Sequence, residues 1–154
     1  MIPWTRIAHF TKQEFPEDPD LYAAPELILA LDRFRKALGF PVHPSPARGA
    51  LARLDGPPSS RHFARGRKSD AVDVFCDGPP LFAWALGMTM FGGVGLYLDT
   101  TFRGRSWTML HLDVRGPERT FWVRDPRGYA YPLGGEAACK TFAAAVAAVA
   151  VRDR

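Results

Sequence analysis

The sequence predicts a single α+β domain over residues 1–154, with a small, mainly antiparallel sheet flanked by helices. The length of 154 residues and a hydrophobic content of 47% suit one globular domain with its own core. Segments with strand-like patterns are grouped in the middle of the chain, between segments with helix-like patterns. Neither an internal repeat nor a linker-like stretch divides the chain, so one layered domain is the expected architecture.

The first helices are predicted from capping residues and from the spacing of apolar residues. Thr11 and Glu14 fit a capping box, which indicates a short helix at that point. A longer helix is expected over Pro25–Leu38, because proline suits the first helical position and Gly39 suits the C-terminal cap. Asp32 is expected to lie away from its apolar face. That face is formed by Leu27, Leu31, Phe34 and Leu38.

Residues 40–68 form a long segment rich in proline, glycine, serine and arginine, FPVHPSPARGALARLDGPPSSRHFARGRK. This composition predicts a loop, with a short extended piece at Val42 and His43. A loop of this length inside a small domain is more often functional than idle.

The remaining elements alternate between strands and helices. A helix is expected over Pro80–Met90, ended by Gly92 and Gly93, and another over residues 136–151. Four strands are expected over residues 71–75, 94–98, 107–114 and 120–123.

Charge, cysteine content and hydropathy narrow the class of protein. The net charge of +4 favours an anionic partner such as an acidic cell-wall polymer, whereas the scattered basic residues do not predict a nucleic-acid partner. Cys76 and Cys139 lie far apart and are expected to be free, buried thiols. The N-terminal segment lacks the apolar run of a signal peptide, so synthesis in the cytoplasm is expected. The C-terminal segment TFAAAVAAVAV is too short to span a bilayer, so no membrane insertion is expected.

The segment WTMLHLDV places two ionisable side chains on one face of an expected strand. Alternate residues of a strand face opposite sides, so His111 and Asp113 point together while the leucines between them face the core. Asp73 holds a comparable position in the strand AVDVF. If these two strands are neighbours in the sheet, Asp73 and His111 converge.

His62 lies in the loop just before the strand that carries Asp73. Two imidazoles and one carboxylate are a usual ligand set for catalytic zinc, which keeps a fourth position open for water. The same residues allow a second interpretation, in which His111 pairs with Asp113 on the surface and His62 is an ordinary loop residue. His9 and His43 lie among apolar residues and are interpreted as structural.

Two motifs carry a resemblance that covers nearly the whole chain. SSRHFARGRKSDAVDVF is similar to a Ser-x-His … Ala-x-Asp signature, and GGVGLYLDTTFRGRSWTMLHLDVRG followed by Trp122 is similar to Gly-Gly-x-Gly-x-Tyr … His-x-Asp … Trp. Both signatures belong to the zinc D-Ala-D-Ala carboxypeptidase family, which includes VanY-like and phage cell-wall peptidases. The fold that this resemblance implies is the hedgehog-type peptidase fold.

The resemblance implies a zinc metallopeptidase, a hydrolase that cuts peptidoglycan peptides as a D,D-carboxypeptidase or endopeptidase at the cell wall. It implies that His62, Asp73 and His111 are the zinc ligands. Ten residues separate His62 from Asp73, more than in the family, so Asp70 is an alternative ligand. Asp113 is the carboxylate nearest to His111 and is the candidate catalytic base, with a role in supporting the ligands as the alternative.

The loop segment from Ser45 to Arg48 loosely fits a Ser-x-x-Arg pattern of the family. The resemblance implies that Arg48 binds the carboxylate of the substrate as a bidentate pair; a solvated loop arginine is the alternative. Thr108 stands where better-known members carry their catalytic acid, and it cannot accept a proton. This departure leaves a second function open, a non-catalytic cell-wall-binding or structural phage or prophage protein that retains the fold.

Overall fold

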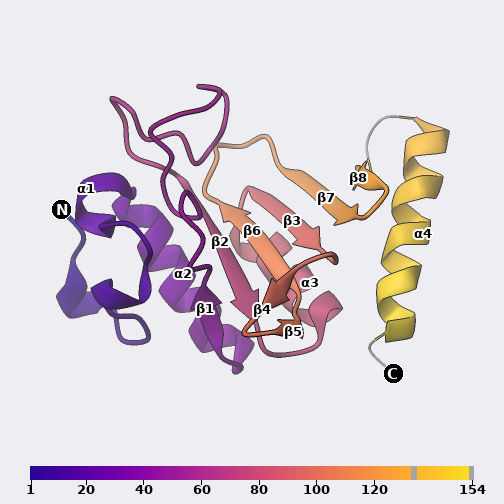
Figure 1. Ribbon diagram of the computed structural model, residues 1–154, viewed down its shortest axis with the longest axis horizontal. Coiled ribbons are helices and arrows are strands. Elements are labelled where there is room, and N and C mark those ends of the chain that lie inside the picture. Colours follow the sequence, from indigo (N-terminus) through magenta and orange to yellow (C-terminus); the bar gives the residue numbers. More distant parts are fainter. Residues whose placement is uncertain (133–134, 153–154) are drawn as a thin grey trace.

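The computed structural model describes residues 1–132 and 135–152 and has a six-stranded sheet at its centre. The strand order is β1-β2-β6-β3-β7-β8, and every neighbouring pair is antiparallel except β3 and β7. Helices α2 and α3 lie behind this sheet, and α4 lies beside β7 and β8 (Figure 1). The predicted α+β class with a mainly antiparallel sheet is therefore confirmed.

The elements occupy most of the chain. The strands of the main sheet are β1 Val42–Pro44, β2 Ala71–Cys76, β3 Gly93–Tyr97, β6 Met109–Asp113, β7 Thr120–Asp125 and β8 Gly128–Ala130. A separate hairpin consists of β4 Thr101–Phe102 and β5 Arg105–Ser106. The helices are α1 Pro19–Tyr22, α2 Pro25–Leu38, α3 Pro80–Met90 and α4 Glu136–Arg152, with short 3₁₀ turns η1 Trp4–Arg6 and η2 Lys12–Glu14.

Helix α2 has the predicted bounds, and one of its acidic residues is buried although it lies off the apolar face. Gly39 takes the left-handed conformation, with φ of +71°, and its backbone N–H donates to the carbonyl of Arg35. Asp32 is only 7% exposed, because its carboxylate accepts the backbone N–H of His9 at 2.7 Å. The helical spacing keeps Asp32 off the face of Leu27, Leu31 and Phe34, and the N-terminal segment covers it there.

The core lies between the sheet and the helices behind it. Each fully buried leucine, valine or phenylalanine contributes about 1.5–3 kcal/mol relative to an exposed one. In β2, β3 and β6 the alternating residues of one set point into this core, so the other set faces the opposite side of the sheet. The largest fully buried side chains include Leu27, Ile28, Leu31, Phe34, Val72, Val74, Val94, Leu96, Leu110 and Leu112.

Helix α4 packs against the edge of the sheet through a few of its many alanines and valines. Ala145 and Val149 are buried, and the ring of Phe142 lies 5.6 Å from that of Trp84 on α3, measured between centroids. Within residues 1–132 and 135–152, none of the helices combines the length and the apolar character that a bilayer crossing needs.

Both cysteines are free, as predicted, but only Cys76 is buried. The expectation of a buried Cys139 is wrong, because this residue lies on the exposed side of α4. Burial raises the pKa of the Cys76 thiol to about 12, and the thiolate is the reactive form of cysteine.

We therefore expect one thiol per chain to react with a disulfide reagent at pH 8 in the folded protein, and two to react in denaturant. The measurement is the absorbance of the released reagent anion over time. Two thiols that react equally fast in the folded protein would contradict this arrangement.

Candidate metal centre

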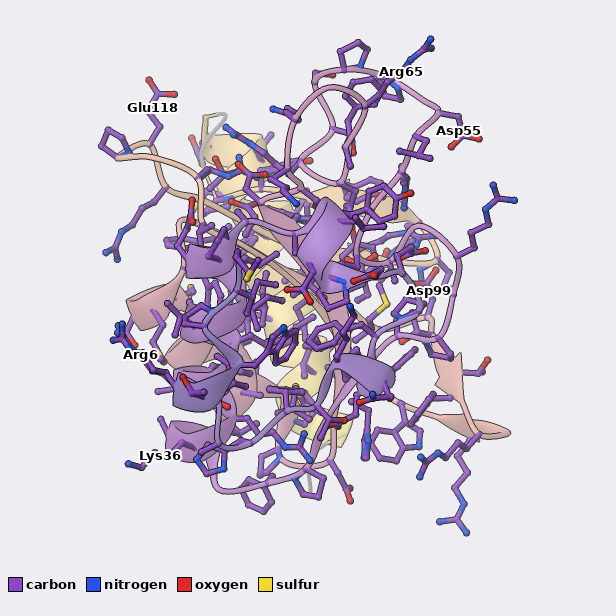
Figure 2. The ribbon with its side chains drawn as sticks, turned by 90° about the vertical axis from the view of Figure 1, so that its left-hand side faces the viewer. Arg6, Lys36, Asp55, Arg65, Asp99 and Glu118 are labelled. Carbon is purple, nitrogen blue, oxygen red and sulfur yellow. The ribbon has the colours of Figure 1, made fainter. Side chains whose placement is uncertain are left out.

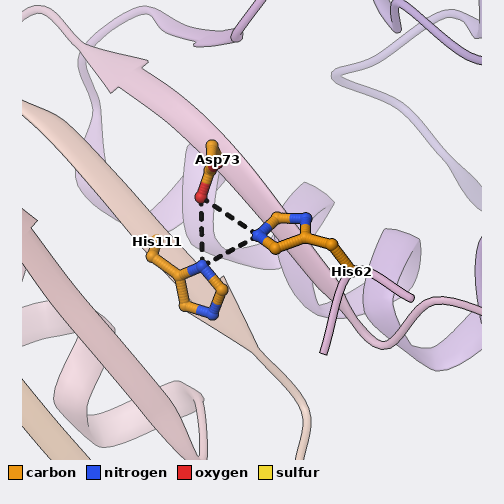
Figure 3. Close-up of side chains that lie close together, drawn as sticks. All are labelled: His62, Asp73 and His111. Carbon is orange, nitrogen blue, oxygen red and sulfur yellow. Dashed lines mark hydrogen bonds and ion pairs between the residues drawn. The ribbon is translucent and has the colours of Figure 1, made fainter. Parts of the chain in front are cut away.

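The pairing of β2 with β6 brings Asp73 and His111 together. Their register places Asp73 directly opposite His111, and side chains in such positions start about 4.5–5.5 Å apart on the same face. Figure 3 shows the two side chains turned toward each other, with the ring of His62 entering from a loop. The neighbouring strands that the sequence interpretation required are therefore present.

The loop that carries His62 is held in place by backbone hydrogen bonds. Arg53 donates its N–H to the carbonyl of His62 and accepts the N–H of Ala64 with its own carbonyl, both at 2.7 Å. Arg67 adds a side-chain bond to the carbonyl of Ser60 at 2.6 Å. Figure 2 shows the outer parts of this loop region projecting away from the sheet, with Arg65 and Asp55 at the tips. The imidazole of His62 is thus positioned by a fixed segment of an otherwise exposed loop.

Three ligand atoms meet at distances that suit one small cation. His111 Nδ1 lies 3.0 Å from both Asp73 Oδ1 and His62 Nε2, and His62 Nε2 lies 3.3 Å from Asp73 Oδ1. Ligand atoms that bind a tetrahedral zinc ion at 2.0–2.1 Å lie about 3.3–3.4 Å from one another. The group of His62, Asp73 and His111, called the trio below, can therefore hold a metal ion.

Asp70, the alternative ligand, lies outside this group. Its Oδ2 accepts from the guanidinium of Arg61 at 3.0 Å, and its backbone N–H donates to the carbonyl of the same residue. The extra residues between His62 and Asp73 thus form a loop, and the ion pair and backbone hydrogen bond between Asp70 and Arg61 join its two ends.

Hydrogen bonds within the trio and to Asp113 shift the pKa values of Asp73 and His111. Burial alone raises the pKa of Asp73, but hydrogen bonds from His111 and His62 outweigh it and hold that pKa well below its ordinary value. Burial lowers the pKa of His111, and hydrogen bonds to Asp113 and Asp73 outweigh it, raising that pKa to about 9. A divalent cation bound by the trio would take the place of the proton that otherwise joins these groups.

Asp113 stands behind His111, on the far side from the other two trio members. Its side chain is fully buried, and its Oδ2 accepts from His111 Nε2 at 3.1 Å. Its Oδ1 accepts from the backbone N–H of Arg115 at 3.1 Å and from Nε of the same residue at 2.7 Å. Burial raises the pKa of Asp113, but the hydrogen bonds from Arg115 and His111 outweigh burial and hold this pKa well below its ordinary value. The carboxyl group therefore stays ionised. A carboxylate in this position fixes the orientation and tautomer of a ligand histidine.

Two glycines of β3 leave room for these groups. A Cβ at Gly93 would lie 2.1 Å from Asp113 Oδ2, and one at Gly95 would lie 2.3–2.6 Å from the indole of Trp122. Gly95 pairs with His111 on one side and with Trp122 on the other. The Gly-Gly-x-Gly motif therefore leaves β3 without side chains at the two positions where Asp113 and Trp122 occupy the space.

We expect Gly95→Ala to displace the Trp122 ring and, through it, the His111 ring that lies 5.1 Å away between centroids. Overpacking of this kind costs about 1–3 kcal/mol of unfolding free energy, and zinc affinity should fall as well. Gly116→Ala is the matched control, because nothing lies within 4 Å of a Cβ at that position. Urea denaturation measures the unfolding free energy of both variants, and equal values for the two would contradict this account.

The trio lies in an open cleft of about 400 Å³. Its walls carry basic and aromatic side chains. The residues that line it are Arg53, Ser59, Ser60, Arg61, His62, Asp73, Tyr97, His111, Arg115, Trp122, Tyr129 and Tyr131. Such a concave space beside a metal-binding group can admit a small part of a polymer.

Arg48, predicted to bind a substrate carboxylate, is exposed and lines a neighbouring cavity of about 450 Å³. Arg53 lines both this cavity and the cleft of the trio. Neither Arg53 nor the tyrosines of the β8 region belong to a motif that points to a site in the sequence. The alternation of tyrosines in GYAY is the one sequence signal that would have indicated a strand with two aromatic side chains on one face.

The fold and the site together define an α+β domain with a candidate metal centre of two histidines and one aspartate. Comparisons with known proteins found no matching family model, no matching curated protein and no matching solved structure.

Proposed function

We propose that this protein is a zinc-dependent peptidase that hydrolyses peptide bonds of peptidoglycan. The observation that carries the proposal is the spacing and burial of the trio at an open cleft. The two motif resemblances described above add support, because their histidines and their aspartate are the residues that meet. Zinc bound by two histidines and one carboxylate polarises a carbonyl group and lowers the pKa of water.

The protein's own residues prepare the trio for this chemistry. With Asp113 ionised, His111 Nε2–H donates to it, so once a metal ion replaces the proton of Nδ1, the lone pair of that atom would face Asp73 and His62. His62 presents Nε2 to the same space, which places the proton of its neutral ring on Nδ1. Both imidazoles thus offer a lone pair toward one point.

Arg53 is the arginine we propose to bind a substrate carboxylate. Among the arginines of the cleft, Arg61 is paired with Asp70 and Arg115 with Asp113. Arg53 donates its Nε to the carbonyl of Gly49 and makes no ion pair within the described part of the chain. Its terminal nitrogens can therefore form a bidentate pair with a carboxylate in the cleft. Arg48 remains the alternative for a carboxylate that reaches the neighbouring cavity.

A second function is favoured by the distribution of acidic groups. Among the described residues that line the cleft, Asp73 is the single carboxylate, and Asp113 is already engaged by His111 and Arg115. A proton taken from water would then have to go to Asp73 or Asp113, and both carboxylates are already held by hydrogen bonds. A cell-wall-binding protein that uses the same cleft without turnover is the second candidate.

The test incubates zinc-loaded protein with purified muropeptides and follows the products by mass spectrometry. The proposal expects loss of terminal D-alanine or splitting of the peptide, and no product with Asp73→Asn. Protein that carries one zinc ion and leaves all muropeptides intact would contradict the peptidase. Retention of that same protein on insoluble peptidoglycan would then support the second candidate.

A further inference from the structure

Four aromatic side chains form a continuous surface that leads away from the trio. Ring centroids of Trp122 and Tyr131 lie 6.3 Å apart, and those of Tyr131 and Tyr129 lie 6.5 Å apart with planes tilted by only 21°. Tyr97 meets Tyr129 edge to face at 6.2 Å. We call Tyr97, Trp122, Tyr129 and Tyr131 the aromatic platform.

The sheet register holds the platform in place. Tyr97, Arg124 and Tyr129 lie side by side on β3, β7 and β8. The guanidinium of Arg124 lies 5.3 Å from the ring centroid of Tyr97 and 5.7 Å from that of Tyr129, close enough for cation–π attraction. Three members of the platform, Tyr97, Trp122 and Tyr129, therefore lie on strands, and Tyr131 follows the end of β8 directly.

The outer end of the platform is open to solvent although its members are aromatic. Tyr129 is 56% exposed and Tyr131 is 42% exposed. Both line the cleft of the trio, as do Tyr97 and Trp122. Two nearly parallel, exposed rings at the edge of a cleft suit a ligand with a flat apolar face.

A polar group inside the platform adds a second requirement for the ligand. Trp122 is only 7% exposed and lines the cleft, and its Nε1–H, which has Tyr97 as a polar neighbour, makes no hydrogen bond of good geometry among the described residues. A buried donor of this kind is expected to find an acceptor. The ligand therefore combines an apolar face for the tyrosines with an oxygen at its edge for the indole.

A pyranose ring has both properties, because its faces present C–H groups and its edges present hydroxyl and carbonyl oxygens. An aliphatic chain lacks the polar edge, and a peptide backbone lacks the flat apolar face. Amino sugars linked in a chain would also leave Arg53 free to bind a carboxylate carried by the attached peptide.

The distance from the platform to the trio suits a sugar that carries a short peptide. The ring of Trp122 lies 5.1 Å from that of His111, and the steps onward to Tyr131 and Tyr129 bring the total path to at most about 18 Å. An extended peptide of about five residues covers that length at 3.3–3.6 Å per residue. A sugar on Tyr129 and Tyr131 can therefore be joined to a peptide bond at the trio.

We propose that the aromatic platform binds a sugar ring of the glycan chain, so that the preferred substrate is a peptide still attached to its amino sugar. This inference rests on the proposed function for the peptide part, and it adds a glycan subsite that Tyr129, Tyr131 and Trp122 form.

The test compares two substrates that share one peptide, with and without the attached disaccharide. The double variant Tyr129→Ala, Tyr131→Ala should lower the ratio of kcat/KM on the sugar-bearing substrate to that on the bare peptide by about two- to tenfold per tyrosine. Phe82→Ala is the matched control, because Phe82 is also an exposed aromatic residue, 49% exposed, and lies on α3. An unchanged ratio in the double variant would overturn the inference and leave the peptidase proposal intact.

A binding measurement separates this inference from the proposed function. Peptide-free glycan oligomers are titrated into the protein, and tryptophan fluorescence reports binding. We expect saturable binding that the double variant loses and that Asp73→Asn and Phe82→Ala retain. Glycan binding without any cleavage would support the platform and contradict the peptidase. Absence of glycan binding, in protein that cleaves both substrates equally, would contradict the platform alone.

Discussion

His111→Ala is expected to lower the affinity of the protein for zinc by at least about 100-fold, and His62→Ala should do the same. Loss of supporting groups around a metal ligand already costs about 10–100-fold, and these variants remove a ligand itself. The remaining pair, one imidazole and one carboxylate, cannot close the triangle of 3.0–3.3 Å that the trio forms. Competition with a chromophoric zinc chelator measures the change.

His9→Ala is the matched control for these variants. His9 is exposed, and its contact with Asp32 uses the backbone N–H, so the substitution leaves that bond in place. We expect wild-type zinc affinity in this variant. Wild-type affinity in His62→Ala or His111→Ala would contradict the assignment of these residues as ligands.

The same variants should lose the thermal stabilisation that zinc provides. A ligand that binds only the folded state stabilises it by about 2.7 kcal/mol at a free concentration 100 times its Kd. The wild-type protein should therefore unfold at a higher temperature when zinc is added, and His111→Ala should not. An equal rise in Tm for both proteins would place the zinc ion elsewhere.

Asp113→Ala is expected to have the second largest effect, because it disturbs both stability and zinc binding. The carboxylate is fully buried and contacts His111 and Arg115. Removing one partner of a buried ion pair costs about 3–5 kcal/mol, because the other charge is left without compensation. Arg115 retains some solvent contact, with 18% of its side chain exposed, so we expect the lower end of that range. Zinc affinity should fall by about 10–100-fold.

The chain provides a matched control with the same local sequence pattern. Asp125 and Arg127 repeat the Asp-x-Arg spacing of Asp113 and Arg115, but the side chain of Arg127 is 75% exposed. An ion pair with one exposed partner contributes less to stability than a buried one, so Asp125→Ala should lower the unfolding free energy less than Asp113→Ala and leave zinc affinity unchanged. Asp113→Asn keeps the shape and removes the charge; if it binds zinc as tightly as the wild type, Asp113 does not position His111.

The helices and the sheet face of the site could be predicted from local patterns. Helices α2 and α3 begin and end where proline, glycine and apolar spacing indicate. Period-two alternation placed Asp73 and His111 on outward faces of their strands, and their direct pairing agrees. The position of His62 beside them followed from the motif resemblance, because no local pattern determines where the side chain of a loop histidine lies in the folded protein.

Other features depend on contacts between distant segments and could not be predicted locally. Strand β6 lies between β2 and β3, an order that no single segment encodes. The hairpin of β4 and β5 and the short strand β8 are too brief for a periodic signal. Asp32 is buried because the backbone amide of His9, 23 residues away, donates to it.

The most direct measurement for the central claim is an anomalous difference map from zinc-soaked crystals, collected at the zinc absorption edge. We predict one peak per chain within bonding distance of His62 Nε2, Asp73 Oδ1 and His111 Nδ1, with one further position open to solvent. A peak at other residues, or no peak at saturating zinc, would contradict the claim that the trio is the metal centre.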